Sequence, residues 1–206
     1  SATLLSIIDD LLDYTKFEAG QLDLESVAFD PVELVEGVAR AHAPLALRKG
    51  LALTCYVQAD LPWLIGDPVR VRQALDNFLT NALKFTSEGH VGIRAFRSAS
   101  TPSDATTLDL VLEVLDTGIG MSPDTQAQLF EPFVQGDAAT ARRFGGSGLG
   151  LSICRRLARS MRGRVAVESE LGRGSRFSFA VPLEIGEARQ SVEPALPSVV
   201  VRAQAP

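Results

Sequence analysis

Two asparagines and a lysine share one face of the segment that follows Asp67. At about 100° per residue, Asn77, Asn81 and Lys84 project from the same side of a helix. Such a face can simply be solvated, but asparagine is a poor helix former. An amide oxygen is a hard ligand that suits Mg²⁺, and a lysine supplies a point charge for a phosphate. The spacing therefore fits both a solvated face and a metal–phosphate site.

A carboxylate and two glycines follow an apolar segment in the middle of the chain. Asp116 ends this segment, and Gly118 and Gly120 come directly after it. Glycines let a backbone approach a flat ligand closely or adopt positive φ. A carboxylate at a strand end can accept a hydrogen bond from an exocyclic amine such as that of adenine. A plain strand-to-helix turn could have the same residues, so this motif alone does not distinguish a ligand-binding loop from a turn.

A glycine-rich run precedes a predicted helical segment over 152–161, and its glycines are Gly145, Gly146, Gly148 and Gly150. Free backbone donors and a helix N-terminus in this place favour anion binding. The run is neither a Walker loop nor a dinucleotide fingerprint. Residues 133–148 contain few large apolar side chains, which predicts a mobile lid. A flexible linker is the alternative, but it leaves Arg142 and Arg143 unexplained.

The elements that must position these groups follow from periodicity and capping signals. Asp67-Pro68 is a strong helix start, with Asp as N-cap and Pro at the first helical position. Helices are expected over 1–20, 31–49, 67–85, 123–130 and 149–161, and strands over 51–57, 91–96, 108–115, 165–169 and 176–181. The fold class is therefore α+β, a two-layer sandwich in which helices cover one face of a mostly antiparallel sheet.

Length and composition set outer limits on function. The 206 residues suit one packed domain with an appendage, and 46% of them are hydrophobic. A net charge of −5 gives no electrostatic case for nucleic acid. No apolar stretch reaches the ~20 residues that span a bilayer, so no membrane contact is expected in this segment. Cys55 and Cys154 have no metal-ligand spacing and are expected to be reduced.

Taken in order, these motifs resemble the nucleotide-binding domain of sensor histidine kinases of the hybrid type. That domain has the Bergerat ATP-binding fold of the GHKL superfamily, which DNA gyrase and mismatch-repair ATPases share. Arg70–Thr86 resembles the asparagine box, Asp116–Met121 the first glycine box, and 130–133 the phenylalanine box. Residues 146–151 match the second glycine box, and 172–177 are similar to the closing Gly-x-Gly-Ser-x-Phe segment.

The resemblance implies ATP and Mg²⁺ as cofactors and a role for each motif. Asp116 would bind the adenine amino group, assisted by Ser175 through water, while Gly118 and Gly120 would shape the base pocket. Asn81 would coordinate Mg²⁺ with Asn77 in support.

For the phosphates, the resemblance implies that Lys84 would meet them directly. Arg143 would close over the triphosphate together with the backbone of the second glycine box, which comprises Gly146, Gly148, Leu149 and Gly150.

The opening residues are similar to the second helix of the dimerisation and phosphotransfer module of hybrid kinases. The resemblance thus implies that 1–25 is part of that incomplete bundle, 26–185 the ATP-binding catalytic domain, and 186–206 a linker towards a further domain. The apolar stripe of the first helix would also suit a core helix of this domain. His42 and His90 lack the context of an accepting histidine and are expected to be ordinary surface or packing residues.

The resemblance implies a protein-histidine kinase of a bacterial two-component system. It would donate the γ-phosphoryl group of ATP to a histidine upstream of this chain, within a homodimer, and pair with a response regulator or receiver domain. A cytoplasmic location below an inner-membrane sensor is expected. The chain alone should bind ATP, not phosphorylate itself, and hydrolyse ATP very slowly.

Two other functions remain open. An ATPase of the gyrase or mismatch-repair class would have a glutamate base where Asn77 stands, and an amide cannot deprotonate water. A catalytically silent nucleotide-binding module is the other alternative. Arg162 departs from the family pattern, because a glycine is usual there, and it is expected to be tolerated on the surface.

Overall fold

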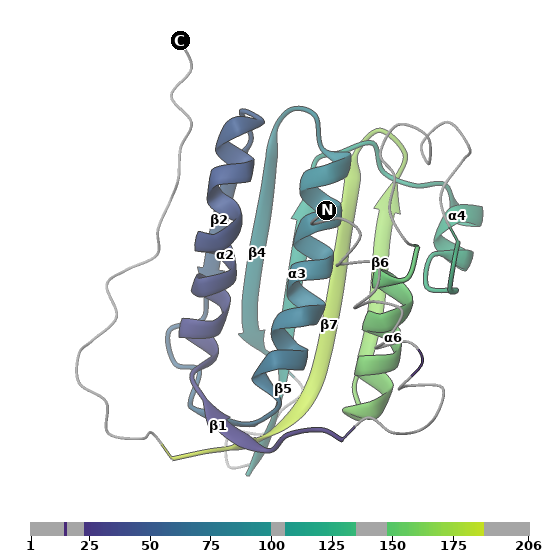
Figure 1. The fold of residues 1–206 in the computed structure, drawn as a ribbon. Helices are drawn as coiled ribbons and strands as arrows, with labels where there is room; N and C mark the ends of the chain where they lie inside the picture. The colour runs from purple at the N-terminus through teal and green to yellow at the C-terminus, as the bar shows by residue number, and fades with distance from the viewer. Residues whose placement is uncertain (1–14, 16–22, 100–105, 135–147, 188–206) are drawn as a thin grey trace.

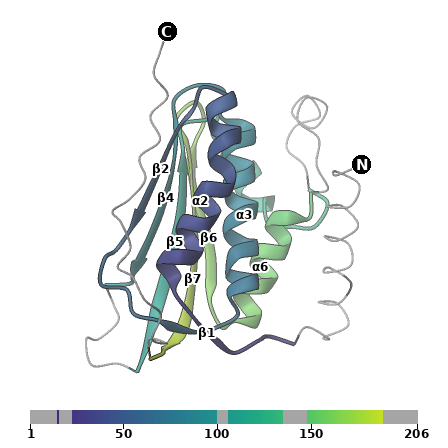
Figure 2. The same ribbon diagram turned by 60° about the vertical axis from the view of Figure 1, so that its left-hand side comes forward.

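The computed structural model describes residues 15, 23–99, 106–134 and 148–187, and these form two layers (Figure 1). Helices lie on one face of the sheet (Figure 2). The helices are α2 (Pro31–Arg48), α3 (Pro68–Phe85), α4 (Pro123–Gln128) and α6 (Gly150–Ser160), of which α2, α3 and α6 cover the sheet. The strands are β1 (Val27–Phe29), β2 (Ala52–Val57), β3 (Leu64–Gly66), β4 (His90–Arg97), β5 (Thr107–Asp116), β6 (Arg164–Glu170) and β7 (Gly174–Ile185).

The sheet is antiparallel except at one edge. Its order is β1-β3-β7-β5-β4-β2, and β6 also pairs with β7. Only the β2–β4 pair is parallel among the strands described. The expected two-layer sandwich with a mostly antiparallel sheet is therefore confirmed. None of the described helices combines the length and apolar character that crossing a membrane requires.

Both long helices begin with the same device, an aspartate followed by a proline. The Asp30 Oδ1 accepts a hydrogen bond from the Val32 amide at 2.8 Å, and the Asp67 Oδ1 accepts one from the Arg70 amide at 3.0 Å. The other Asp67 oxygen accepts a bond from the Glu25 amide at 3.1 Å. Asp67 is only 3% exposed. Its carboxylate links Glu25, which lies before β1, to the start of α3.

The helix α3 has one face in the core and one directed towards the pocket described below. Phe78 on the core side packs against Phe177 of β7, with ring centroids 5.3 Å apart. The buried residues of α3 are Val71, Ala74, Leu75, Phe78, Leu79, Ala82 and Leu83. Because this face is fully apolar, the rotation of α3 about its axis is fixed, and the asparagines must face the other way.

The boundaries of several elements differ from those that the sequence predicts. The short strands β1 and β3 were not expected; they pair with each other, and β3 also pairs with the end of β7. The last strand continues to Ile185, and α4 ends at Gln128. The expected first helix, the lid and the linker lie largely or wholly outside the described residues.

Both cysteines are free thiols, as the sequence predicts. Cys154 is buried, and Cys55 is half-buried on β2. Burial and the nearby Glu36 carboxylate raise the pKa of the Cys55 thiol to about 11.

Candidate functional site

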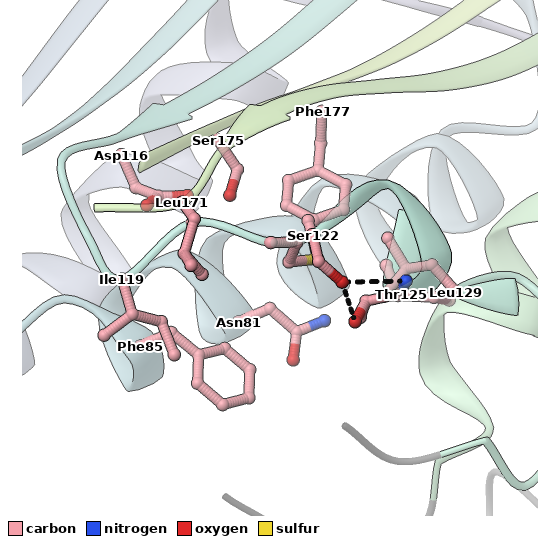
Figure 3. Close-up of a pocket in the computed structure, with 13 residues that line it drawn as sticks. Asn81, Phe85, Asp116, Ile119, Ser122, Thr125, Leu129, Leu171, Ser175 and Phe177 are labelled. Atoms are coloured by element: carbon pink, nitrogen blue, oxygen red, sulfur yellow. Dashed lines mark hydrogen bonds between the residues drawn. The ribbon is translucent and has the colours of Figure 1, made fainter. Parts of the chain in front are cut away.

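A pocket opens between α3, the loop that follows β5, α4 and the turn between β6 and β7 (Figure 3). Asp116 and Ser175 lie together at one end, and the Asn81 amide points in from α3 (Figure 3). The other lining residues are Phe85, Ile119, Gly120, Met121, Ser122, Thr125, Leu129, Leu151, Leu171 and Phe177. The pocket thus has mostly apolar walls with a few polar groups, as is usual for sites that bind small molecules.

The carboxylate of Asp116 is a buried acceptor with its own hydrogen-bond donors. Asp116 ends β5 opposite Ser175 of β7 and is 9% exposed. Its Oδ1 accepts the Gly118 amide at 2.8 Å. Burial raises the pKa of the Asp116 carboxyl, while hydrogen bonds from Gly118 and from the backbone and hydroxyl of Ser175 counteract the rise. These donors orient the carboxylate, which lines the pocket.

Glycines allow the loop after β5 to pack directly on the β6–β7 turn. A β-carbon at Gly120, where φ is +62°, would lie 1.9 Å from the Glu170 carbonyl oxygen. A β-carbon at Gly174, where φ is +103°, would lie 1.9 Å from the Asp116 carbonyl oxygen. Neither position can therefore carry a side chain. We call this main-chain contact, formed by residues 116–120 and 170–174, the glycine seam.

Gly118 supports the site without lining the pocket. A β-carbon there would approach the Phe85 carbonyl oxygen to 2.6 Å and the Asp116 Oδ1 to 2.8 Å. Its small size lets the amide reach the carboxylate and holds the loop against the end of α3. Both glycines of the Asp-x-Gly-x-Gly motif are thus required by close approach, as the motif suggests.

The three polar residues predicted on α3 occupy different positions relative to the pocket. Asn81 lines the pocket. Asn77 lies one turn earlier, and its Nδ2 donates to the Gly150 carbonyl at 3.3 Å, which ties α3 to α6. Lys84 lies outside the lining, with its Nζ 4.8 Å from the centre of the Phe85 ring. Burial lowers the pKa of the Lys84 amino group.

The start of α6 contributes main chain and one apolar side chain. Leu149 is 2% exposed and packs in the core, so its side chain does not reach the pocket. Leu151 lines the pocket instead. Gly148 has φ +70°, and its carbonyl accepts the Phe133 amide at 3.2 Å. Arg143 and Gly146 lie outside the described residues.

The structure therefore brings Asn81, Asp116, Gly120 and Ser175 to one pocket. The apolar lining residues were not predicted as site residues, because an isolated leucine or methionine in a sequence usually indicates a core position. Two of them had a usable signal. Ile119 stands between the motif glycines and is 48% exposed, and Leu171 precedes a turn glycine and is 71% exposed. Large apolar side chains in such places indicate a ligand surface more often than a core.

Neither histidine lies at the pocket. The Nδ1 of His42 is 3.1 Å from the Val38 carbonyl and 3.7 Å from Asp76 Oδ1, and its Nε2 is 3.4 Å from Thr80 Oγ1. His42 thus packs between α2 and α3. His90 is exposed at the start of β4.

Comparison with known proteins agrees with this geometry. The family model for histidine kinase-, DNA gyrase B- and HSP90-like ATPases matches residues 66–185. The sensor histidine kinase RcsC of Escherichia coli K12 is 38% identical over 184 residues, which are 89% of this chain and 18% of RcsC. The sensor protein GacS of Pseudomonas syringae pv. syringae is 41% identical over 194 residues, which are 94% of this chain and 21% of GacS. The chain thus spans about a fifth of the length of these relatives.

Among solved structures, full-length ShkA in complex with AMPPNP aligns with a TM-score of 0.77 at 37% identity. The match covers 90% of this chain and 37% of ShkA. The pocket, the order of its motifs and these matches lead to one assignment. The chain belongs to the family of histidine kinase-, DNA gyrase B- and HSP90-like ATPases, as a catalytic domain of the sensor histidine kinase type.

Proposed function

We propose that this domain binds Mg²⁺-ATP in the pocket and donates the γ-phosphoryl group to a histidine of the full-length kinase. The observation that carries the proposal is the Asp116 carboxylate, which is buried, is oriented by Gly118 and Ser175, and lines the pocket. The exocyclic amine of adenine is the donor that such an acceptor suits. The apolar side chains of Ile119, Met121 and Leu171 offer a surface for the purine ring.

Asn81 fits a magnesium ion that is bound mainly by phosphates. Among the described residues, no group of three or more His, Cys, Asp or Glu could hold a metal ion. Mg²⁺ usually retains several waters and takes only one or two protein oxygens beside substrate phosphates. A single amide oxygen from Asn81 is sufficient for that arrangement. The ion would neutralise charge on the phosphate oxygens.

The phosphates would lie between the α3 face and the beginning of α6. The N-cap Leu149 makes no side-chain capping bond among the described residues, so the first amides of α6 are available to an anion. Asn77 holds this helix start in place through the Gly150 carbonyl. We propose that Lys84, beside the pocket, and Arg143 add positive charge to the same region.

Transfer to a protein nucleophile is favoured over hydrolysis, because the described residues that line the pocket offer no base near the phosphate end. Among the described residues that line the pocket, Asp116 is the only carboxylate, and it lies at the base end. Asn77 is an amide whose nitrogen is engaged by Gly150. Neither group can remove a proton from a water beside the γ-phosphate.

The larger assembly is also part of the proposal. Residues 1–25 would belong to the dimerisation and phosphotransfer module of a homodimeric kinase, 26–185 to the catalytic domain, and 186–206 to a linker. The partner would be a response regulator or receiver domain. The domain would work on the cytoplasmic side of a membrane-anchored sensor.

Calorimetric titration with ATP and Mg²⁺ tests the pocket. Asp116→Ala should abolish detectable binding, while Glu184→Ala, which removes an exposed carboxylate from β7, should leave it unchanged. Equal affinity in both variants would contradict the assignment.

Phosphotransfer is tested with γ-labelled ATP and an added dimerisation module. Acid-labile label should appear on that module, and label on His42 or His90 would overturn the proposal.

A further inference from the structure

The helix α4 and the residues beside it form one wall of the pocket. Ser122, Thr125 and Leu129 line the pocket, and Thr125 and Leu129 lie on the far side from Asp116 (Figure 3). None of the six residues of α4 is buried, and Leu129, directly after the helix, packs partly against the core. The helix itself therefore gains little from apolar burial, and its position depends on polar contacts.

One side chain of α4 makes two hydrogen bonds to neighbouring elements. The Nε2 of Gln126 donates to the Met121 carbonyl at 3.1 Å and to the Ser169 carbonyl at 2.9 Å. The amide group has two protons, so both oxygens can be satisfied at once. Met121 follows Gly120 in the loop after β5, and Ser169 lies near the end of β6. Gln126 thus joins α4 to two segments that are 48 positions apart in sequence.

The two segments that Gln126 joins are also bound to each other. The Met121 amide donates to the Ser169 Oγ at 2.9 Å. Beside this bond, a β-carbon at Gly120 would lie 1.9 Å from the Glu170 carbonyl oxygen, so the two backbones are in direct contact. This anchor is held together without α4. The two bonds of Gln126 therefore fix where α4 lies relative to the glycine seam.

The other hydrogen bonds of α4 within the described part of the chain are local. The Ser122 Oγ accepts the Thr125 amide at 3.3 Å, and the Gln126 amide donates to the Ser122 carbonyl at 3.0 Å. These contacts close the helix but do not attach it to the rest of the domain. Beyond α4, Glu131 pairs with Arg155 of α6 at 3.0 Å, with the Glu131 side chain 52% exposed. So exposed an ion pair contributes little.

We propose that Gln126 is a positioning residue for the nucleotide, an inference that rests on the proposed ATP site. Its two bonds hold α4 against the end of β6, so that Thr125 and Leu129 close the side of the pocket away from Asp116. Gln126 lies outside the pocket lining, so it acts on the ligand through α4. Without these bonds the wall is free to move outward, and its contacts with the nucleotide must be ordered at the expense of affinity.

The test removes the donors of Gln126 and keeps the size of the side chain. Gln126→Met lacks both donors, and Gln126→Glu places an acceptor oxygen opposite two carbonyl oxygens. We expect the dissociation constant for ATP, measured by calorimetry on the whole domain, to rise about tenfold in Gln126→Met and further in Gln126→Glu. Gln128→Glu makes the same charge change at an exposed position of α4 and should bind ATP like wild type.

Hydrogen exchange without nucleotide distinguishes a positioning role from general destabilisation. A six-residue helix is unstable on its own, so the amides of α4 should exchange about tenfold faster in Gln126→Met than in wild type. The amides that pair β5 with β7 should keep their protection, because α4 contributes no buried residue to the core. Faster exchange across the whole sheet would show that Gln126 supports the fold in general and would overturn the inference.

The binding outcomes separate this inference from the function beneath it. Wild-type protein that does not bind ATP would overturn the proposed function and the inference together. Wild-type protein that binds ATP, with unchanged affinity in Gln126→Met, would overturn the inference alone. Equal losses of affinity in Gln126→Glu and Gln128→Glu would do the same, because charge repulsion of ATP would then explain the effect.

Discussion

The Asn77 amide and the Gly150 carbonyl oxygen, 73 positions apart in sequence, form a hydrogen bond of 3.3 Å. A β-carbon at Gly150 would lie 3.1 Å from the Asn77 Oδ1, so the two residues are in close contact. This bond sets where α6 begins relative to α3. It also explains why an amide suits the position, since the facing atom is a carbonyl oxygen that needs a donor.

Asn77→Asp should therefore destabilise the domain. Two acceptors would face each other, and we expect the free energy of unfolding to fall by about 1–2 kcal/mol in urea titration. An unchanged free energy of unfolding would contradict the contact role that we give to Asn77.

Asn81→Ala should remove the metal-dependent part of ATP binding. Wild-type affinity should be higher with Mg²⁺ than with a chelator, because the ion bridges the Asn81 oxygen and the phosphates. The two affinities should converge in the variant. Thr80→Ala changes the neighbouring exposed residue of α3 and should keep the full metal dependence. If the ATP affinity of Asn81→Ala still depended on Mg²⁺, the polar face of α3 would be merely solvated.

Asp116→Asn should change the pH dependence of stability in a defined direction. Burial raises the pKa of Asp116 above 3.8 in the folded state, so the folded protein binds this proton more tightly than the unfolded chain. The contribution of Asp116 to stability therefore falls as pH rises from 3.8 through the folded pKa, and is constant above it.

Asparagine does not titrate, so the free energy of unfolding of Asp116→Asn relative to wild type should increase over that pH range. Urea unfolding at several pH values from about 4 to about 8 provides the measurement. The lost hydrogen bonds of the carboxylate change the difference in unfolding free energy between variant and wild type by a constant. The quantity to read is therefore the slope of that difference with pH. A slope of the opposite sign would show that the carboxyl is stabilised as the anion.

Arg162→Gly should stabilise the domain by about 0.5–1 kcal/mol. Arg162 has φ +57° at the end of α6, where the Gly163 amide bonds to the Ala158 carbonyl and the Arg162 amide to Arg159. This is a Schellman motif, and its left-handed position normally holds glycine. The arginine is exposed, as expected, but it adopts a backbone conformation that costs energy.

The neighbouring glycine provides the opposite control. A β-carbon at Gly163 would lie 2.2 Å from the Ala180 carbonyl oxygen, so Gly163→Ala should cost about 1–3 kcal/mol. Thermal or urea unfolding of both variants tests the pair. Destabilisation by Arg162→Gly would contradict the strain argument.

Lys49→Met should weaken the anchoring of the C-terminal end of α3. The Lys49 Nζ donates to the carbonyls of Leu83 and Thr86, the latter at 3.0 Å, and so satisfies oxygens at the end of the helix. We expect a loss of about 1 kcal/mol in unfolding free energy. Arg48→Met removes an exposed neighbouring charge and should have a smaller effect. Equal losses of unfolding free energy in the two variants would mean that the change in net charge, and not the hydrogen bonds of Lys49, determines the effect.

The long elements were predictable because their signals are local. The Asp-Pro starts of α2 and α3 and the period of the apolar face of α3 are properties of adjacent residues. The strands β1 and β3 have three residues each and pair with each other, and β3 also pairs with β7; no local pattern encodes this pairing. The same holds for the left-handed backbone of Arg162, since arginine gives no sign of it.

The site was predictable to the extent that its chemistry is carried by rare residue patterns. Asn81, Asp116 and Gly120 stood out because amides on a helix and glycines around a carboxylate are uncommon. The placement of Asn77 against Gly150, and of Lys84 beside Phe85, depends on how α3 packs against α6. The hydrogen bonds of Ser169 to Met121, Gly174 and Ser175 were not predictable, because a serine in a strand becomes informative only when its partners are known.

The glycine seam limits how this pocket can change in evolution or under drug selection. The seam is a contact of main chain with main chain, and Gly120 and Gly174 have no room for any larger residue. An inhibitor that contacts Gly120, which lines the pocket, would meet a position that resistance mutations cannot enlarge without displacing the loop. Escape would have to arise at the rim, where Ile119 and Leu171 are exposed and can be replaced at little cost to stability.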